Sequence, residues 1–204
     1  MKSGSRVELP ELLVPDAASW RRWLARAGGD EDDDGRGVWL VLAKKGVTEP
    51  TALSYDQALE EALCHGWIDG QVGRRDELTY RQRFTPRRAR SKWSQRNVAL
   101  VGRLTQEGRM RAGGLEAVRG AREDGRWEAA YPAQSQIEVP DDLAAALEAQ
   151  PRAKAMFAIL TSQNRYAVLY RVQDAKRADT RAKRIERFVA MLARGETVYP
   201  QRRR

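Results

Sequence analysis

The chain has 204 residues, of which 42% are hydrophobic and 32% charged, with a net charge of +9. This composition is typical of a globular protein that builds its own core. No apolar run approaches the roughly 20 residues of a membrane-spanning helix. The positive charge favours acidic partners such as nucleic acid, phosphorylated small molecules or anionic lipid. Only seven of the 37 basic residues are lysine, so a coding bias towards arginine is the alternative explanation.

The sequence also carries two indications of where the protein works. Its lone cysteine, Cys64, excludes an internal disulfide and fits a reducing compartment. The first fifteen residues lack the continuous apolar core of a signal peptide. We therefore expect a cytoplasmic protein without a membrane span.

Helices in the first part of the chain are predicted by apolar residues at helical spacing, bounded by capping residues. The clearest helix begins with a capping box of Ser54 and Gln57 and ends at Gly66. The other helices of this part are expected at residues 16–28, 94–108 and 114–125.

Strands are predicted where runs rich in β-branched and aromatic residues occur. These runs span residues 38–45, 67–72 and 78–84. The last two should form a hairpin around a turn near Arg75. An acidic run at residues 30–34 precedes the first strand and is expected to be a solvated loop.

The rest of the chain predicts only helices. The segment 133–140 is polar and reads as a linker, and the final helix should be capped by Thr180. We therefore predict the α+β class: a small antiparallel sheet with packed helices, followed by an all-helical C-terminal portion. The expected parts are an α+β domain at 1–132, the linker 133–140, a helical domain at 141–197 and a basic tail at 198–204.

Cys64, His65 and Asp69 lie within six positions and suggest a nucleophilic site. However, consecutive side chains on a helix diverge by roughly 100°, so Cys64 and His65 do not face each other. We interpret Cys64 as a packed, unreactive residue. One histidine and one cysteine give no basis for a zinc site, and no phosphate loop or dinucleotide fingerprint occurs. We expect no metal and no cofactor.

The segment "GWIDG" places Trp67 and Asp69 on one face of a strand. With the turn centred near Arg75, Asp69 would lie opposite Arg81 and Trp67 opposite Arg83. Asp69 could then orient these guanidinium groups towards a ligand. The alternative is a structural cross-strand ion pair without function.

Residues 80–97 contain seven basic residues and no acidic one. Ser94 should cap the next helix, whose N-terminus adds a positive field. Arginines and hydroxyl groups together predict an anion site; the alternative is a solvated basic loop with Trp93 in the core. The candidate ligand-binding residues are Trp67, Arg81, Arg83, Arg87, Arg88, Ser91, Lys92 and Trp93, with the two tryptophans available for stacking.

The blocks "VWLVLAKK", "ALEEALCHGWIDG", "RFTPRRARSKWSQRNV" and "LTQEGRMRAGG" resemble the YdeI/OmpD-associated family, often described as bacteriocin-protection proteins. The C-terminal part, beginning "VPDDLAAALEAQ", resembles that family's helical domain, so the likeness runs from Trp20 to Gly195. Many members carry Phe or Tyr where His65 stands, which speaks against an essential role for it. The resemblance implies an association with antimicrobial-peptide tolerance and with a porin, and it implies no reaction.

These observations leave three function hypotheses. The first is a cytoplasmic stress- or peptide-tolerance protein that binds an anionic small molecule, a nucleotide or nucleic acid in a basic groove. The second is an enzyme that acts on a phosphorylated or carboxylate metabolite, with Asp69 as catalytic acid/base. The third is a protein-interaction module that uses the basic C-terminal helix. The sequence does not indicate an oligomeric state.

Overall fold

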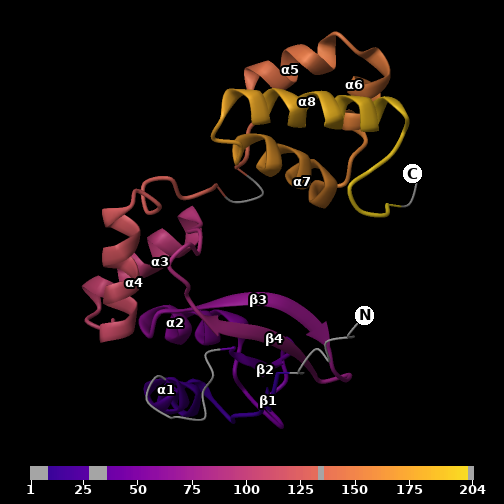
Figure 1. Ribbon diagram of the computed structural model, residues 1–204. Helices are drawn as coiled ribbons and strands as arrows, with labels where there is room; N and C mark the ends of the chain where they lie inside the picture. Colours follow the sequence, from indigo (N-terminus) through magenta and orange to yellow (C-terminus); the bar gives the residue numbers. More distant parts are fainter. Residues whose placement is uncertain (1–8, 28–35, 133–135, 202–204) are drawn as a thin grey trace, which may run out of the picture. The chain divides into compact units, whose positions relative to one another are not determined.

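The computed structural model describes residues 9–27, 36–132 and 136–201. The chain separates into two compact units, one up to Ala130 and one from Tyr131 onward (Figure 1). Among the described residues, the first unit contains a four-stranded sheet and four helices, and the second contains four helices. The predicted α+β class with a helical C-terminal portion is confirmed. The acidic run at 30–34 lies outside the described residues.

The sheet of the first unit has the strand order β1-β2-β4-β3. The strands are β1 (Glu11–Leu12), β2 (Val38–Ala43), β3 (Trp67–Arg74) and β4 (Thr79–Pro86). Antiparallel pairing joins β2 to β4 and β4 to β3, whereas β1 runs parallel to β2. The sheet is therefore mixed rather than purely antiparallel. The sequence did not predict β1, because two residues are too few to show a strand period.

One face of this sheet is covered by α1 (Ala17–Arg26) and α2 (Tyr55–Cys64). The fully buried Trp20 packs against this face, and its indole N–H donates to the carbonyl of Ala58 across 3.1 Å. Both expected helix starts are present, since Asp16 caps α1 and the predicted capping box starts α2. The apolar side chains of β2 and β4 that point to this face complete the core: Val38, Leu40, Leu42 and Phe84.

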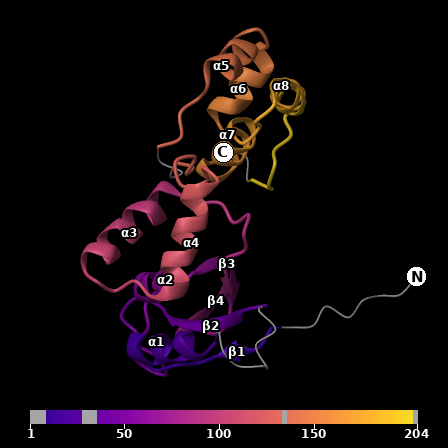
Figure 2. The ribbon, with the colours of Figure 1, turned by 60° about the vertical axis from the view of Figure 1, so that its left-hand side comes forward.

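The helices α3 (Gln95–Gln106) and α4 (Ala112–Glu123) lie beside α2, as Figure 2 shows. A second cluster of apolar side chains joins these three helices. The first turn of α4 lies directly against the end of α2. A Cβ atom on Gly114 would lie 2.3 Å from the carbonyl oxygen of Cys64. The two helix backbones are therefore in contact, which only glycine permits.

A buried carboxylate links α2 to its neighbours. The Glu61 side chain is 4% exposed and accepts two hydrogen bonds from Arg21, at 2.6 and 2.7 Å, and one from Arg109 at 2.8 Å. Such a charge is stable inside a protein only when it is paired and hydrogen-bonded. Glu61 therefore connects α1, α2 and the segment that follows α3.

The second unit is built from helices with their own apolar core. They are α5 (Asp141–Glu148), α6 (Pro151–Ala158), α7 (Ser162–Gln173) and α8 (Ala178–Ala193). The prediction that Thr180 caps α8 was wrong, because the helix begins at Ala178 with Arg177 at the capping position. Among the described residues, no helix is both long and apolar enough to cross a membrane.

Candidate functional site

The pairing of β3 with β4 differs from the predicted register. Asp69 pairs with Phe84 rather than with Arg81, a shift of three positions along β4, and Trp67 is shifted by the same amount. Because an odd shift exchanges the two faces of a strand, Asp69 does not share a face with the arginines. The predicted contact between Asp69 and Arg81 or Arg83 is therefore wrong.

Two features cause this shift, and the first is the turn, which Asp76 organises. Its carboxylate accepts hydrogen bonds from the backbone N–H groups of Leu78 and Thr79, at 2.9 and 2.7 Å, and from the Thr79 hydroxyl at 2.8 Å. The hydrogen bonds from Thr79 lower the pKa of Asp76 to about 2. The turn therefore lies at residues 75–78, and both strands are longer than predicted. The turn alone moves the pairing by four positions, as the pair of Gly73 and Arg81 shows. A bulge in β3, the second feature, reduces the shift at Asp69 to three and so exchanges the faces.

A β-bulge in β3 lies opposite Arg83. The register is interrupted between Asp69 and Val72, so Gly70 and Gln71 together oppose a single residue of β4. The side-chain amide of the buried Gln82 donates to the carbonyl of Gly70 across 2.7 Å and holds the bulge in place. Bulges of this kind often lie next to functional sites, where they redirect a side chain.

A pocket of about 260 Å³ opens beside this bulge. It lies on the side of the sheet that carries Arg83, opposite the face that contains Phe84 and the core. Among the described residues, the walls contain two arginines and no acidic side chain, which makes this part of the surface electropositive. Its lining residues are Gly70, Gln71, Arg83, Thr85, Pro86, Arg88 and Ser91.

The loop after β4 supplies one wall of the pocket. The backbone N–H of Arg88 donates to the hydroxyl oxygen of Ser91 at 2.9 Å, and the N–H of Ser91 donates to the carbonyl of Arg88 at 2.8 Å. Arg126 holds the same loop by donating to the carbonyl of Ser91 across 2.8 Å. Since the Ser91 oxygen accepts the bond from Arg88, its own O–H proton can be donated to a ligand.

Arg83 supplies the opposite wall. Its aliphatic stem lies beside Gly70, where a Cβ atom would be 3.6 Å from the Cβ of Arg83. One terminal nitrogen is 3.5 Å from the carbonyl of Arg36. The buried Nε has no hydrogen-bond partner among the residues that the structure describes. A buried donor of this kind is stabilised by a bound acceptor.

Two other candidate arginines do not line the pocket. Arg81 lies over the indole of Trp39, with Cζ 4.9 Å from the ring centroid, and 3.9 Å from a carboxylate oxygen of Glu11. The guanidinium of Arg87 lies 3.5 Å from the ring centroid of Trp93 and donates to the carbonyl of Lys92. In the structure both side chains make intramolecular contacts away from the pocket.

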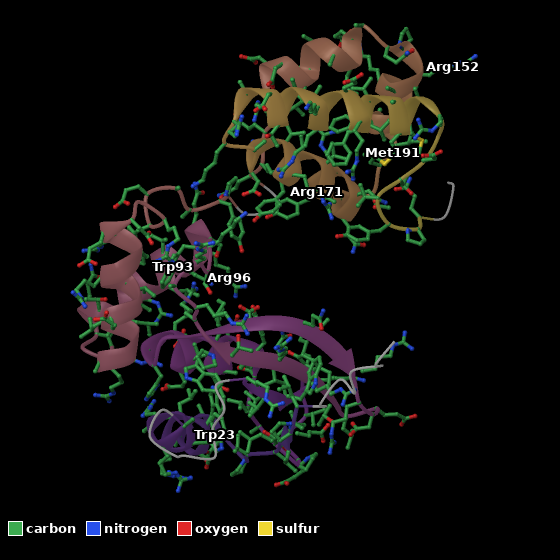
Figure 3. All side chains as sticks on the ribbon, viewed as in Figure 1. Trp23, Trp93, Arg96, Arg152, Arg171 and Met191 are labelled. Atoms are coloured by element: carbon green, nitrogen blue, oxygen red, sulfur yellow. The ribbon has the colours of Figure 1, made fainter. Side chains whose placement is uncertain are left out.

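The two candidate tryptophans are core residues. Trp67 is 4% exposed and meets Trp20 and Trp23 edge-on. Trp93, labelled in Figure 3, is 2% exposed. Arg87 lies over its ring, and the ring centroid of Trp127 is 4.8 Å away. Neither ring has a free face in this structure, so neither is placed for the expected stacking on a ligand.

Asp69 lies at a separate polar cluster near the N-terminus of α2. Its carboxylate accepts a hydrogen bond from the phenol of Tyr55 at 2.9 Å. The Tyr55 ring in turn lies 5.4 Å below the guanidinium of Arg96, which is labelled in Figure 3. Burial and the negative charge of Asp69 raise the pKa of the Tyr55 phenol. The role of Asp69 as acid/base stays a prediction.

The Cys64 and His65 pair has the geometry of structural residues. Cys64 is 1% exposed, and burial raises the pKa of its thiol to about 11. The Nδ1 atom of His65 lies 2.9 Å from the carbonyl oxygen of Glu61, in the same helix. Within the described ranges, no group of three or more His, Cys, Asp or Glu residues is placed to hold a metal ion.

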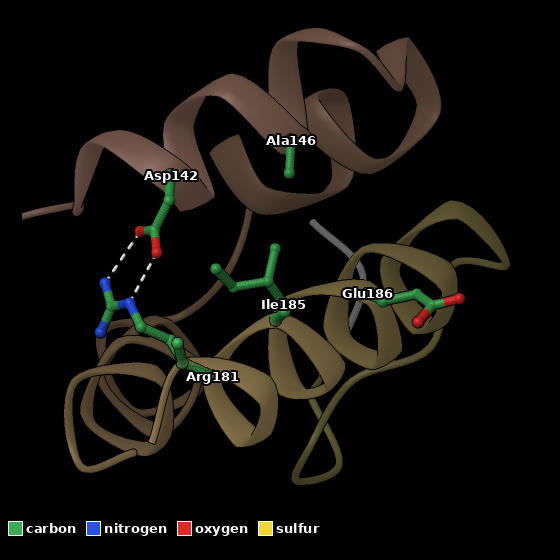
Figure 4. A pocket seen from close by; sticks show the side chains of 7 residues that line it. Asp142, Ala146, Arg181, Ile185 and Glu186 are labelled. Atoms are coloured by element: carbon green, nitrogen blue, oxygen red, sulfur yellow. Dashed lines mark hydrogen bonds and ion pairs between the residues drawn. The ribbon is translucent and has the colours of Figure 1, made fainter. Parts of the chain in front are cut away.

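The helical unit contains a hollow of its own, of about 400 Å³, between α5 and α8 (Figure 4). Ala146 and Ile185 contribute apolar surface, and Asp142 accepts two hydrogen bonds from Arg181, at 2.6 and 2.8 Å. This pair neutralises its own charge. The hollow is larger than the pocket beside β3, but it lacks converging polar groups for a charged ligand.

The pocket thus contains three of the predicted site residues, Arg83, Arg88 and Ser91. Sequence reasoning missed the other four that line it. Thr85 could have been found, because it follows Arg83 by two positions and so shares its face. The bulge has no sequence signal except Gly70, and the contribution of Gln71 depends on it.

The fold is thus an α+β domain with a basic pocket, followed by a separate helical domain. Residues 12–117, just over half of the chain, match the family model of a domain of unknown function (DUF8412), and the chain belongs to that family. Residues 136–195 match the family described as "Bacteriocin-protection, YdeI or OmpD-Associated". No curated protein and no solved structure matches significantly.

These matches confirm the resemblance to the YdeI/OmpD-associated family and locate it in the helical part of the chain. The blocks "GWIDG" and "FTPRR", which also suggested that family, fall inside the stretch that matches the other family model. The pocket beside β3 therefore lies wholly in a domain whose family description names no function.

Proposed function

We propose that the N-terminal unit binds a compact anionic group in the pocket beside β3. One observation carries the proposal: Arg83, Arg88 and Ser91, from β4 and the loop after it, line one pocket whose described lining contains no acidic residue. Arginine and hydroxyl donors that converge in this way are how proteins hold phosphate and carboxylate groups. The buried Nε of Arg83, which has no hydrogen-bond partner in the described part of the chain, supports the same conclusion.

The geometry favours binding over catalysis at this place. The acid/base suggested by the sequence, Asp69, accepts a hydrogen bond from Tyr55 and is absent from the pocket lining. A general acid or base must reach the reacting proton within hydrogen-bond distance. We therefore place an anion-binding role ahead of an enzymatic one, and propose it as part of a cytoplasmic stress- or peptide-tolerance protein.

Two arginine variants test the proposal. Binding of inorganic phosphate to the full chain is measured by titration calorimetry in low salt. Arg83→Gln and Arg88→Gln should each weaken binding about tenfold or more, because a hydrogen bond to a charged group contributes about 1.5–3 kcal/mol. The matched control is Arg90→Gln, which removes an equal charge from the same loop at a residue outside the pocket lining.

Nucleic acid is a distinct outcome of the same experiment. Binding to a polyanion releases counterions, so its affinity falls steeply with salt, and neutralising Arg87 and Arg88 together should flatten that slope. Binding of a single anion in a pocket depends on the lining residues instead. If all three single variants, Arg90→Gln included, lose affinity equally, the pocket is not the site and a diffuse basic surface is.

A further inference from the structure

We propose that the pocket selects a phosphate monoester that carries a hydroxyl group close to the phosphate. The side-chain amide of Gln71 forms a hydrogen bond with this hydroxyl group. The inference rests on the anion-binding function proposed above and names the class of its ligand. Three features of the pocket carry it: its charge, its hydroxyl donors, and the position that the bulge gives to Gln71.

The charge of the pocket suits a dianion. Arg83 and Arg88 bring two positive charges, and none of the lining residues that the structure describes is acidic. Behind the loop, Arg126 contacts Ser91 and pairs with Asp124. A phosphate monoester carries about −1.5 to −2 at pH 7 and so balances two arginines, whereas a carboxylate carries only one negative charge.

The donors of the pocket also exceed what a carboxylate needs. Two guanidinium groups and the hydroxyls of Ser91 and Thr85 border the same space. A carboxylate has two oxygens, while a phosphate ester presents three terminal oxygens that each accept hydrogen bonds. The set of donors therefore matches the phosphate group better.

The bulge explains how a neutral side chain comes to lie beside these cations. Because Gly70 and Gln71 together oppose Arg83, the extra residue changes the alternation of the strand, and Gln71 lines the same pocket. The buried Gln82 holds this arrangement through the carbonyl of Gly70. Gln82 is thus a positioning residue, and it does not itself line the pocket.

The amide of Gln71 fits a hydroxyl neighbour of the phosphate. A primary amide and a hydroxyl group both donate and accept hydrogen bonds, so they can pair in either direction. The volume of about 260 Å³ lies just below the roughly 300–1,000 Å³ of pockets that enclose drug-sized ligands. The enclosed part of the ligand is therefore a phosphate with a small hydroxylated substituent, and a nucleoside would extend outside it.

Three probes test this on the full chain by titration calorimetry at pH 7.5: glycerol 3-phosphate, methyl phosphate and glycerate. Glycerol 3-phosphate should bind most tightly, methyl phosphate several-fold more weakly, and glycerate at least tenfold more weakly. Gln71→Ala should remove the difference between the two phosphate esters by weakening glycerol 3-phosphate to about the affinity of methyl phosphate. Gln106→Ala, at an exposed glutamine of α3 outside the pocket, is the matched control.

The pH dependence gives a second readout. Lowering the pH from 7.5 to 5.0 protonates the phosphate ester, whose second pKa is near 6, and should weaken both phosphate probes about tenfold. His65, the single histidine of the sequence, does not line the pocket.

The outcomes separate this inference from the proposed function. If glycerate binds as tightly as glycerol 3-phosphate, the ligand is not specifically a phosphate ester. The same conclusion follows if the affinity for the phosphate probes does not change with pH. In both cases the proposed anion binding stands. If the wild type binds the two phosphate esters with equal affinity, the proposed hydrogen bond between Gln71 and the ligand hydroxyl is wrong. If none of the three probes binds, the proposed function fails together with the inference.

Discussion

The phenol of Tyr55 donates a hydrogen bond to the carboxylate of Asp69 across 2.9 Å. This contact joins the first turn of α2 to β3 on the face of the sheet that contains Phe84. Arg83 directly precedes Phe84 in β4, so its side chain lies on the opposite face of the sheet. Asp69 and the pocket beside β3 are therefore separate features of the same hairpin, and substitutions can address them independently.

Replacing Asp69 by Asn should leave phosphate binding within about twofold of the wild type. Because the amide oxygen can still accept from Tyr55, the loss of stability should be small, about 1 kcal/mol. The pKa of Tyr55 should fall towards its ordinary value, since the charge of Asp69 is one cause of its rise. Thermal unfolding, calorimetry and phenol absorbance during a pH titration measure the three effects.

A different result for Asp69→Asn would favour the enzyme hypothesis. If the variant unfolds like the wild type but loses ligand binding or a turnover, Asp69 acts on the ligand. Tyr55→Phe is the control, because it removes the same hydrogen bond and keeps the carboxylate.

Cys64 should react slowly with thiol reagents under native conditions. Its side chain is 1% exposed, and burial raises the thiol pKa to about 11, so little thiolate exists at neutral pH. Labelling at pH 8 should proceed at least a hundredfold more slowly than in denaturant. Rapid native labelling, together with loss of phosphate binding in Cys64→Ala, would contradict the structural role.

Two glycines of α4 provide a matched pair for the contact with α2. In Gly114→Ala the new Cβ would lie 2.3 Å from the carbonyl oxygen of Cys64, a clash with backbone that should destabilise the fold by about 1–3 kcal/mol. Around Gly120 a Cβ would meet nothing within 4 Å, so Gly120→Ala should raise stability by up to about 1 kcal/mol. Denaturant unfolding of the two variants checks the opposite signs.

Glu61 should make stability depend on acid pH. Burial would raise the pKa of this carboxyl, but hydrogen bonds from Arg21 and Arg109 outweigh it and hold the pKa below its ordinary value. A carboxyl with a lowered pKa stabilises the fold above its unfolded-state pKa of about 4.3, and this contribution is lost as the pH falls through the folded-state value.

Glu61→Gln should therefore destabilise the protein at pH 7 by about 2–4 kcal/mol, because two arginines lose a buried partner. The variant should also lose part of the wild type's pH dependence below pH 5. Unfolding free energies measured from pH 3 to 7 decide the matter. Parallel curves for wild type and variant would show that other carboxyls cause the acid sensitivity.

Much of the fold follows from local patterns in the sequence. The capping box of Ser54 and Gln57 starts α2 as expected, because capping depends on residues three positions apart. The same reasoning wrongly predicted that Thr180 caps α8, which starts at Ala178 without a side-chain cap. There the apolar face of the helix outweighs the preference of a capping residue.

The site was less predictable because it depends on register. The arginines of β4 were visible in the sequence, but the turn at Asp76 and the bulge at Gly70 decide which of them share a face with which partner. A single displaced residue reverses every such assignment. Trp93 shows a related limit, because an aromatic residue among arginines looks exposed until the core that receives it is known.

The apolar cores of the two units share no residue: the described clusters of the first lie between Leu12 and Ala130, and that of the second between Ile137 and Val198. Each family match also falls within one unit. A gene that lost or exchanged either part would therefore leave the interior of the other intact. Evolution can recombine these two halves as separate modules, so related chains should exist in which each occurs beside a different companion.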